Sequence, residues 1–232
     1  AKQAYNQNPN ATSKNLLLKI YNIRAQKHLA KNSLQLARLE VTEALKISPS
    51  SLLFLAELIS IELKDNKIKD AEELVKQVDN LAPKSALIYS LSSDVASAKG
   101  MPDEAAKLLQ KSWALSKTNG VASKYFLILS QSDQLRANTF LDEWALEIPR
   151  SAEPLRKKGT ILLGENKIDQ AVPFFESALK LAPKDVISLN NLAWLYQEKG
   201  DERAITISKQ AHELAPKSGA VADTYGWILI QN

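Results

Sequence analysis

The sequence predicts an all-α protein assembled from consecutive helix-turn-helix units. Three observations lead to this prediction. Prolines recur with a period of about 34 residues, the sequence signature of a repeat array. Alanines recur with the same period, and a residue type that caps helices follows each repeat proline. The repeat prolines are one period apart except for a double gap, where Lys117 stands in place of a proline: Pro49, Pro83, Pro149, Pro183 and Pro216.

Each unit is predicted to open with a helix whose N-cap lies two positions after the proline, because Ser and Asp side chains can accept a hydrogen bond from a free backbone N–H. This first helix is expected to have an ordinary length of about 13 residues. It ends at a turn containing Gly or Asn, residue types that suit the left-handed C-cap of a helix. The predicted N-caps are Ser51, Ser85, Ser151, Asp185 and Ser218, and the clearest turns are 64–67, 99–102, 165–167 and 199–201.

The second helix of each unit carries the repeat alanine, followed by apolar residues at helical spacing such as Leu74, Val75 and Val78. It ends before the repeat proline, because a residue that precedes proline is pushed out of the helical region. Pro173 lies inside such a helix and has no explanation at this level. The repeat alanines keep the period of the prolines, with small departures: Ala37, Ala71, Ala105, Ala137, Ala171 and Ala204.

These signals divide the chain into a series of units. The polar segment 6–14 is predicted to be a loop, and residues 10–15 are the expected insertion that lengthens the first unit. A solenoid needs a polar cap at each end, and neither end of the sequence has one, so we expect a piece of a longer array. The predicted divisions are 1–11 (end of a preceding repeat), 12–51 (lengthened), 52–85, 86–117, 118–151, 152–185, 186–218 and 219–232 (first helix of a seventh unit).

Composition argues against several classes of function. Thirty Lys and Arg are interspersed with 26 Asp and Glu, which does not predict nucleic-acid binding. The chain has no cysteine, and His28 and His212 fall in different units, so we predict no metal site, no cofactor and no nucleophilic triad. The acidic pairs at 72–73 and 142–143 are expected to be solvated. No apolar run is long enough to span a membrane.

The repeat resembles the tetratricopeptide repeat, a helix-turn-helix unit with a small residue at position 8, Ala at 20 and Pro at 32. The resemblance covers nearly the whole chain and implies a right-handed α-α superhelix of about six units with partial terminal units. Ile59 and Tyr125 depart from the small residue at position 8. The best unit, 186–219, has one deletion after Gly200 and shows Leu189, Leu192, Ala193, Tyr196, Gly200, Ala204, Ala211 and Pro216.

The resemblance also implies a concave groove lined by positions 2, 5, 9, 12 and 13 of the first helices. Amide side chains there can pair with the backbone of an extended peptide, and aromatic side chains can anchor it. The earlier repeats do not reproduce the carboxylate clamp of chaperone-binding members of the family, so capture of a C-terminal carboxylate is not expected. The candidate partner-binding residues are Arg156, Thr160, Asn190, Asn191, Trp194, Gln197, Asp223 and Trp227.

The four tryptophans divide into two pairs. Trp113 and Trp144 fall on second helices and are predicted to lie in the core. Trp194 and Trp227 occupy position 9 of first helices, where a peptide anchor and a side chain covered by its neighbours are both open interpretations.

The predicted function is a non-catalytic scaffold that binds a protein or extended peptide in its groove. A narrower resemblance rests on 189–196, 199–201 and 223–229, which are similar to the C-terminal repeats of bacterial PEP-CTERM/exosortase-associated repeat lipoproteins. That resemblance implies a bacterial exopolysaccharide export and protein-sorting system, with a lipid-anchored parent protein facing the periplasm. A cytoplasmic location stays open. The alternative function is the substrate-recruiting arm of an enzyme, for example a glycosyltransferase, whose catalytic domain lies outside this sequence.

Overall fold

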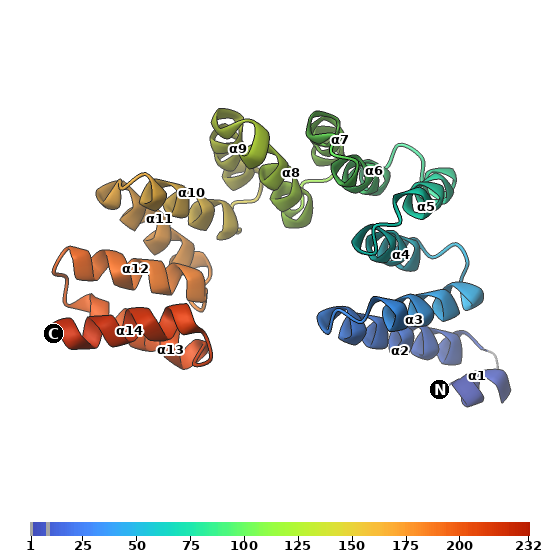
Figure 1. Ribbon diagram of the computed structural model, residues 1–232, viewed down its shortest axis with the longest axis horizontal. Coiled ribbons are helices and arrows are strands. Elements are labelled where there is room, and N and C mark those ends of the chain that lie inside the picture. The colour runs from blue at the N-terminus through green and yellow to red at the C-terminus, as the bar shows by residue number, and fades with distance from the viewer. Residues whose placement is uncertain (1, 8–9) are drawn as a thin grey trace. The chain divides into compact units, whose positions relative to one another are not determined.

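The computed structural model describes residues 2–7 and 10–232, and within these residues all regular secondary structure is α-helical. The all-α prediction is therefore confirmed. The chain divides into two compact units, residues 1–116 (unit 1) and residues 117–232 (unit 2), whose helices are labelled in Figure 1.

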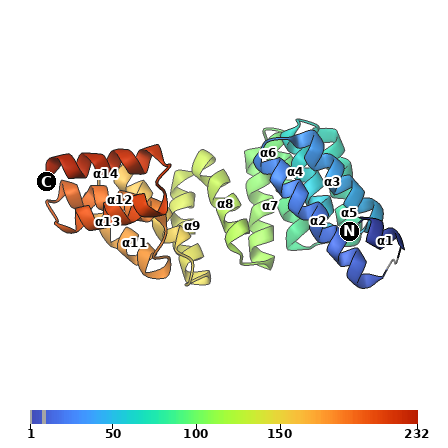
Figure 2. The same ribbon diagram turned by 90° about the horizontal axis from the view of Figure 1, so that it is seen from below.

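Unit 1 is a succession of helix pairs. In it α2 packs on α3, α4 on α5 and α6 on α7, while the short helix α1 lies beside α2 at one end of the unit (Figures 1 and 2). Its helices are α1 (Lys2–Gln7), α2 (Ala11–Ala30), α3 (Leu34–Ile47), α4 (Leu52–Lys64), α5 (Ile68–Leu81), α6 (Ala86–Ala98) and α7 (Pro102–Leu115).

Unit 2 repeats the same arrangement, with α8 on α9, α10 on α11 and α12 on α13. The last helix, α14, packs on both α12 and α13. The helices of unit 2 are α8 (Asn119–Ser132), α9 (Gln134–Glu147), α10 (Glu153–Gly164), α11 (Ile168–Leu181), α12 (Val186–Glu198), α13 (Arg203–Leu214) and α14 (Gly219–Gln231).

The turns between paired helices contain the left-handed residues that the sequence predicts. Asn66 and Asn166 have φ of 58° and 57°, and Gly100 and Gly200 have φ of 73° and 67°. Glycine adopts this conformation without steric cost, and asparagine tolerates it better than most residues. The first-helix ends at these four turns are therefore set by local backbone chemistry.

The capping prediction is right for the position of most N-caps and wrong for most of the bonds. The Ser85 hydroxyl accepts from the backbone N–H of Ile88 at 3.3 Å. Ser51, Asp185 and Ser218 are N-caps whose side chains accept no capping bond. Ser151 is not an N-cap, because α10 begins two positions later behind Ala152. The Asp185 carboxylate instead forms an ion pair with Arg156 and accepts a hydrogen bond from the Ser188 hydroxyl.

The prediction of a loop at residues 6–14 is also wrong, because most of these residues belong to helices. Asn6 belongs to α1, and Asn10 is the N-cap of α2 in a reciprocal capping box with Ser13. The Ser13 N–H donates to Asn10 Oδ1 at 2.9 Å, and the Asn10 N–H donates to Ser13 Oγ at 3.1 Å. The polar residues therefore start the helix and lengthen it to 20 residues. Residues 8 and 9 of the expected loop lie outside the described residues.

The repeat alanines are the contact points of the helix pairs. All six are at most 1% exposed. Gly159, on α10 at position 8 of its repeat, shows how close the helices approach: a Cβ on this residue would lie 3.0 Å from the ring of Phe175 on α11. Small residues at these two positions thus allow the paired helices to pack with little space between them. Pro173 lies on an exposed part of α11, and the helix continues past it to Leu181.

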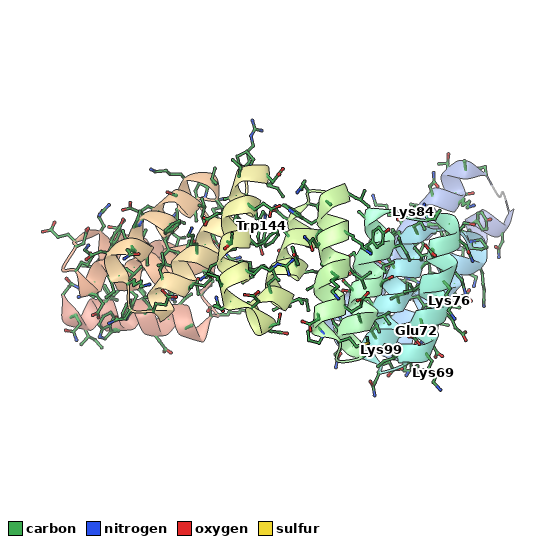
Figure 3. The ribbon with its side chains drawn as sticks, turned by 90° about the horizontal axis from the view of Figure 1, so that it is seen from above. Lys69, Glu72, Lys76, Lys84, Lys99 and Trp144 are labelled. Carbon is green, nitrogen blue, oxygen red and sulfur yellow. The ribbon has the colours of Figure 1, made fainter. Side chains whose placement is uncertain are left out.

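Several charged side chains on the solvent side of the helices form ion pairs. Lys99 Nζ lies 2.8 Å from Glu72 Oε1, with Lys69 and Lys76 on the same helix as Glu72 (Figure 3). The hydrogen bond from Lys99 is the main reason that the pKa of the Glu72 carboxyl is lowered. This pairing supports the solvated interpretation of the acidic pair at 72–73. Among the described helices, none is both long enough and apolar enough to cross a bilayer.

Candidate functional site

The candidate residues lie on three first helices of unit 2, α10, α12 and α14, whose surface we call the first-helix wall. Helix α12 contacts both α10 and α14. Trp194 on α12 and Trp227 on α14 pack against the same apolar cluster, which includes Leu195, Tyr196 and Ile228. The wall is therefore a continuous part of unit 2 with its own supporting core.

The two wall tryptophans differ from the other two in exposure. Trp113 and Trp144 are 3% and 0% exposed, and the Trp144 indole N–H donates to Asn119 Oδ1 at 2.9 Å. Trp194 and Trp227 are only partly buried. An indole held on one side by a core and open on the other is a surface on which a partner can bury apolar area without ordering a flexible side chain.

Asn190 sits one helical turn before Trp194 on α12. Its Oδ1 atom is buried and has no hydrogen-bond donor among the described residues. The neighbouring Asn191 is also partly buried. An unpaired buried carbonyl oxygen is costly, so the Asn190 side chain gains if it turns toward a donor.

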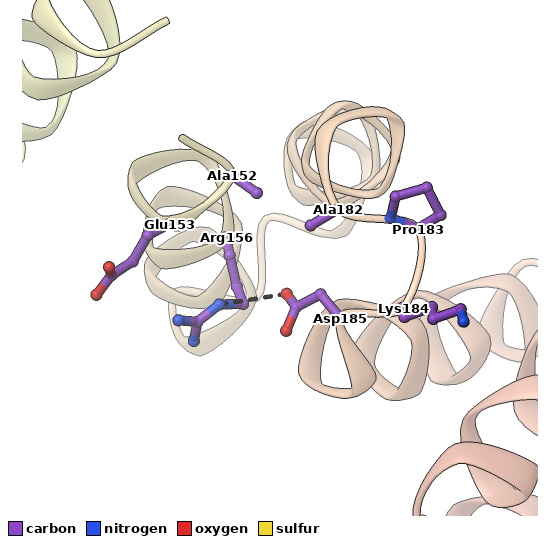
Figure 4. Close-up of a pocket in the computed structure, with 7 residues that line it drawn as sticks. All are labelled: Ala152, Glu153, Arg156, Ala182, Pro183, Lys184 and Asp185. Atoms are coloured by element: carbon purple, nitrogen blue, oxygen red, sulfur yellow. Dashed lines mark ion pairs between the residues drawn. The ribbon is translucent and has the colours of Figure 1, made fainter. Parts of the chain in front are cut away.

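Arg156 lines an open pocket of about 590 Å³ at the start of α10, formed with the loop between α11 and α12. Its Nε lies 3.3 Å from Asp185 Oδ2, and this ion pair joins α10 to the N-cap of α12 (Figure 4). The guanidinium is thus held in place by a carboxylate before any partner binds. The lining residues are Ala152, Glu153, Arg156, Ala182, Pro183, Lys184 and Asp185.

The remaining candidates have smaller roles. Thr160 is exposed, but its hydroxyl donates to the Arg156 carbonyl at 2.9 Å within the same helix. Gln197 Oε1 accepts from Asn232 Nδ2 at 2.9 Å, which ties the end of α12 to the last residue described. Asp223 is exposed on α14. The structure therefore places Trp194 and Trp227 on one cluster with Asn190 nearby, and leaves Asp223 at the edge.

Phe126 on α8 is an aromatic residue at position 9 of its repeat, the position of both wall tryptophans, and it is not among the residues predicted from the sequence. It occupies the same repeat position as Thr160, one repeat earlier. Lys157 Nζ lies 4.8 Å from the centre of its ring. The Ser123 hydroxyl donates to Glu153 Oε1 at 2.7 Å and joins the same two helices. The repeat period is the signal that predicts Phe126, whereas a pattern limited to the last three first helices does not include it.

Tyr196, whose pKa is strongly shifted, has a structural role in unit 2. The Tyr196 hydroxyl donates to Glu176 Oε1 at 2.6 Å, and the Arg203 guanidinium lies 4.0 Å from the centre of the tyrosine ring. Burial, together with the neighbouring Glu176 carboxylate, raises the pKa of Tyr196. Within residues 2–7 and 10–232, no three His, Asp or Glu side chains cluster in a way that could hold a metal ion.

Two sequence profiles of the tetratricopeptide repeat match the chain, one over residues 174–206 and the other over residues 157–185. The matched residues, 157–206, contain much of the first-helix wall, and over this part the sequence is similar to tetratricopeptide repeats. No curated protein matches the chain.

Solved structures show the same fold over most of the chain. Yeast Tom70 superposes with a TM-score of 0.73 at 17% identity, over 84% of this chain and 43% of that one. Pseudomonas aeruginosa PilF gives a TM-score of 0.59 at 16% identity, over 95% of this chain and 100% of PilF. The APC/C complex of Cut9 and Hcn1 gives 0.59 at 17% identity, over 93% of this chain and 46% of that one. At these identities the likeness shows the fold alone.

Proposed function

We propose that the first-helix wall binds an extended segment of a partner protein and that the chain performs no chemistry of its own. Proteins of the tetratricopeptide-repeat family generally bind proteins or peptides. The observation that carries the proposal for this chain is the pair of partly buried indoles, Trp194 and Trp227, held by one apolar cluster on neighbouring helices. They offer two anchors at the same position of two consecutive repeats.

The polar groups beside the indoles fit a peptide backbone. Asn190 is partly buried beside Trp194, and an amide side chain can both donate to and accept from a peptide backbone. Arg156 is positioned by Asp185 near the start of the wall and offers donors to a carbonyl or carboxylate. Phe126 and Lys157 would extend the same surface toward α8.

The test separates binding from folding. Peptides that bind the wild-type chain would be selected from a library of random sequences about 12 residues long, which suits an extended segment in a groove. The affinity of a selected peptide would then be measured for Trp194→Ala, Trp227→Ala and Asn190→Ala. We expect each tryptophan truncation to weaken binding by about 30-fold, equivalent to about 2 kcal/mol, with the helical circular-dichroism signal retained.

Lys209→Ala, at an exposed position of α13, is the matched control and should bind as the wild type does. Trp113→Ala should instead lower stability, by about 3 to 5 kcal/mol for a buried tryptophan. If Trp194→Ala unfolds the chain as badly as Trp113→Ala, Trp194 belongs to the core and the proposed anchor fails.

We also propose that the parent protein works in a bacterial exopolysaccharide export and protein-sorting system, lipid-anchored and facing the periplasm. The support is the similarity of 189–196 and 223–229 to PEP-CTERM/exosortase-associated repeat lipoproteins. Metabolic labelling of the source cells with a fatty acid, followed by fractionation, tests this proposal. A labelled protein in the membrane fraction is expected, and an unlabelled protein in the cytoplasmic fraction would contradict it.

A further inference from the structure

Cations and acids are interspersed over most of the chain, but the first 39 residues carry cations alone. Residues 1–39 contain seven Lys and Arg and no Asp or Glu. Residues 40–116 contain nine against twelve, and residues 117–232 contain fourteen against fourteen. The segment 1–39, which includes all of α2, therefore produces the whole formal excess of +4.

Three of the seven cations are paired inside unit 1. Lys2 reaches Glu43 at 2.8 Å, Arg24 lies 3.8 Å from Glu40, and Arg38 bonds Glu62 and Asp65 at 2.7 Å and 2.6 Å. The other four have no acid within ion-pair distance among the described residues: Lys14, Lys19, Lys27 and Lys31.

Two of these unpaired lysines, Lys14 and Lys19, are placed where their charge does not stabilise the helix. Lys27 and the C-cap Lys31 lie at the C-terminal end of α2, where a positive charge interacts favourably with the helix dipole. Lys14 and Lys19 lie nearer the N-terminal end, where the dipole gives them no such benefit. A negative charge from a binding partner would stabilise them.

Apolar side chains lie between these cations. Leu16 is 54% exposed and Ile23 is 58% exposed, and their seven-residue spacing places them on the same side of α2. Lys19 and Lys27 lie about 40° to either side of Ile23 around the helix axis. We call this surface, formed by Leu16, Lys19, Ile23, Lys27 and Lys31, the α2 outer face; α2 lies at the front of unit 1 in Figure 2.

We propose that the α2 outer face docks an acidic amphipathic helix of a partner protein. Apolar residues spaced seven apart on the partner would pack along Leu16 and Ile23, as two helices pack along a shared seam. Acidic residues flanking that seam would reach Lys19 on one side and Lys27 and Lys31 on the other. This surface lies in unit 1 and is independent of the first-helix wall.

A membrane surface is the other source of negative charge, and the α2 outer face fits it less well. Helices that lie in a bilayer interface present a broad apolar face rich in Trp, Phe and Leu. The α2 outer face offers two aliphatic side chains and no aromatic one, with the polar Gln26 exposed beside them. A narrow apolar line between lysines is instead the pattern of a helix-to-helix contact.

The probe for this proposal is a synthetic helical peptide with leucine in every heptad and glutamate on both flanks. Its binding to the whole chain would be followed by fluorescence anisotropy. A second peptide with glutamine in place of every glutamate is the matched control. We expect the acidic peptide to bind, the glutamine peptide to bind at least about 10-fold more weakly, and added salt to weaken the acidic complex.

Charge-reversal variants locate the binding surface. Lys19→Glu/Lys27→Glu should weaken binding of the acidic peptide by at least about 10-fold, whereas Lys180→Glu/Lys209→Glu, a matched reversal at exposed positions of unit 2, should change it less than about twofold. Ile23→Ser should weaken binding with the charges intact. Because all these side chains are exposed, the helical signal should be unchanged.

Vesicles of phosphatidylcholine containing phosphatidylserine provide the competing surface. The proposal is overturned if the acidic peptide does not bind, if the two charge reversals weaken it equally, or if the vesicles bind more tightly than the peptide.

Discussion

Trp113 and Trp144 are buried, whereas Trp194 and Trp227 keep part of their surface exposed. The repeat predicts burial for the first pair, which lies on second helices. For the second pair, at position 9 of first helices, it leaves an exposed anchor and a covered side chain both open. The sequence could not predict that Asn190 Oδ1 lacks a donor. That depends on which side chains surround it after packing, and no repeat pattern specifies those contacts.

Glu57 on α4 lowers the stability of the fold by an amount that depends on pH. Its Oε1 accepts from Gln26 Nε2 at 2.7 Å, while its Oε2 is buried without a partner among the described residues. Burial raises the pKa of this carboxyl, and the bond from Gln26 lowers it only in part. The folded chain therefore holds the Glu57 proton at a pH where the unfolded chain has lost it, so this group lowers stability as pH rises through the range above the ordinary glutamate pKa.

We predict that Glu57→Gln gains stability relative to the wild type as pH rises from about 4 to about 7, because it removes the cost of ionising a buried carboxyl. Urea unfolding of both proteins across this range would measure the difference. Glu73→Gln, which removes the same charge from an exposed position of α5, should show no such trend. A difference between Glu57→Gln and the wild type that stays constant with pH would contradict the account.

At the scale of a helix pair, Ala171 tests the close contact between α11 and its neighbours. It is 0% exposed and belongs to the cluster that supports both wall tryptophans. Ala171→Leu would force three extra carbon atoms into a filled space, and we expect it to cost about 1 to 3 kcal/mol in thermal or urea unfolding.

Lys180→Leu is the control on the same helix, because Lys180 is exposed. It should change stability by less than about 0.5 kcal/mol. Equal losses at the two positions would show that the repeat register assigned to α11 is wrong.

Most helix boundaries could be predicted from the sequence, and the exceptions have physical causes. Asn66, Gly100, Asn166 and Gly200 end helices through their own backbone preferences, so the sequence reveals those ends. The start of α10 could not be predicted, because Ser151 is the right residue type for a cap and the chain begins its helix two positions later. The polar residues at 10–14 indicate a loop and a capped helix start equally well, since capping residues and loop residues have the same composition.

At the scale of the whole molecule, each unit has apolar clusters of its own. In unit 1 they include Val41 and Ile59, and in unit 2 they include Phe175 and Leu189. In a repeat array each helix pair is stabilised mainly by its neighbours, so a part of the chain with complete clusters can fold without the rest. The two compact units are therefore candidates for independent folding.

We predict that residues 117–232 and residues 2–116, produced separately, each keep the helical circular-dichroism signal of their part of the chain. Limited trypsin digestion should cut first near Lys117, which is exposed between α7 and α8. Because the dependence of unfolding free energy on urea scales with the surface exposed, each fragment should show roughly half the slope expected for a chain that unfolds as one block. A fragment that is unfolded alone would mean that the chain folds as one cooperative unit. The wall could then no longer be studied apart from the α2 outer face.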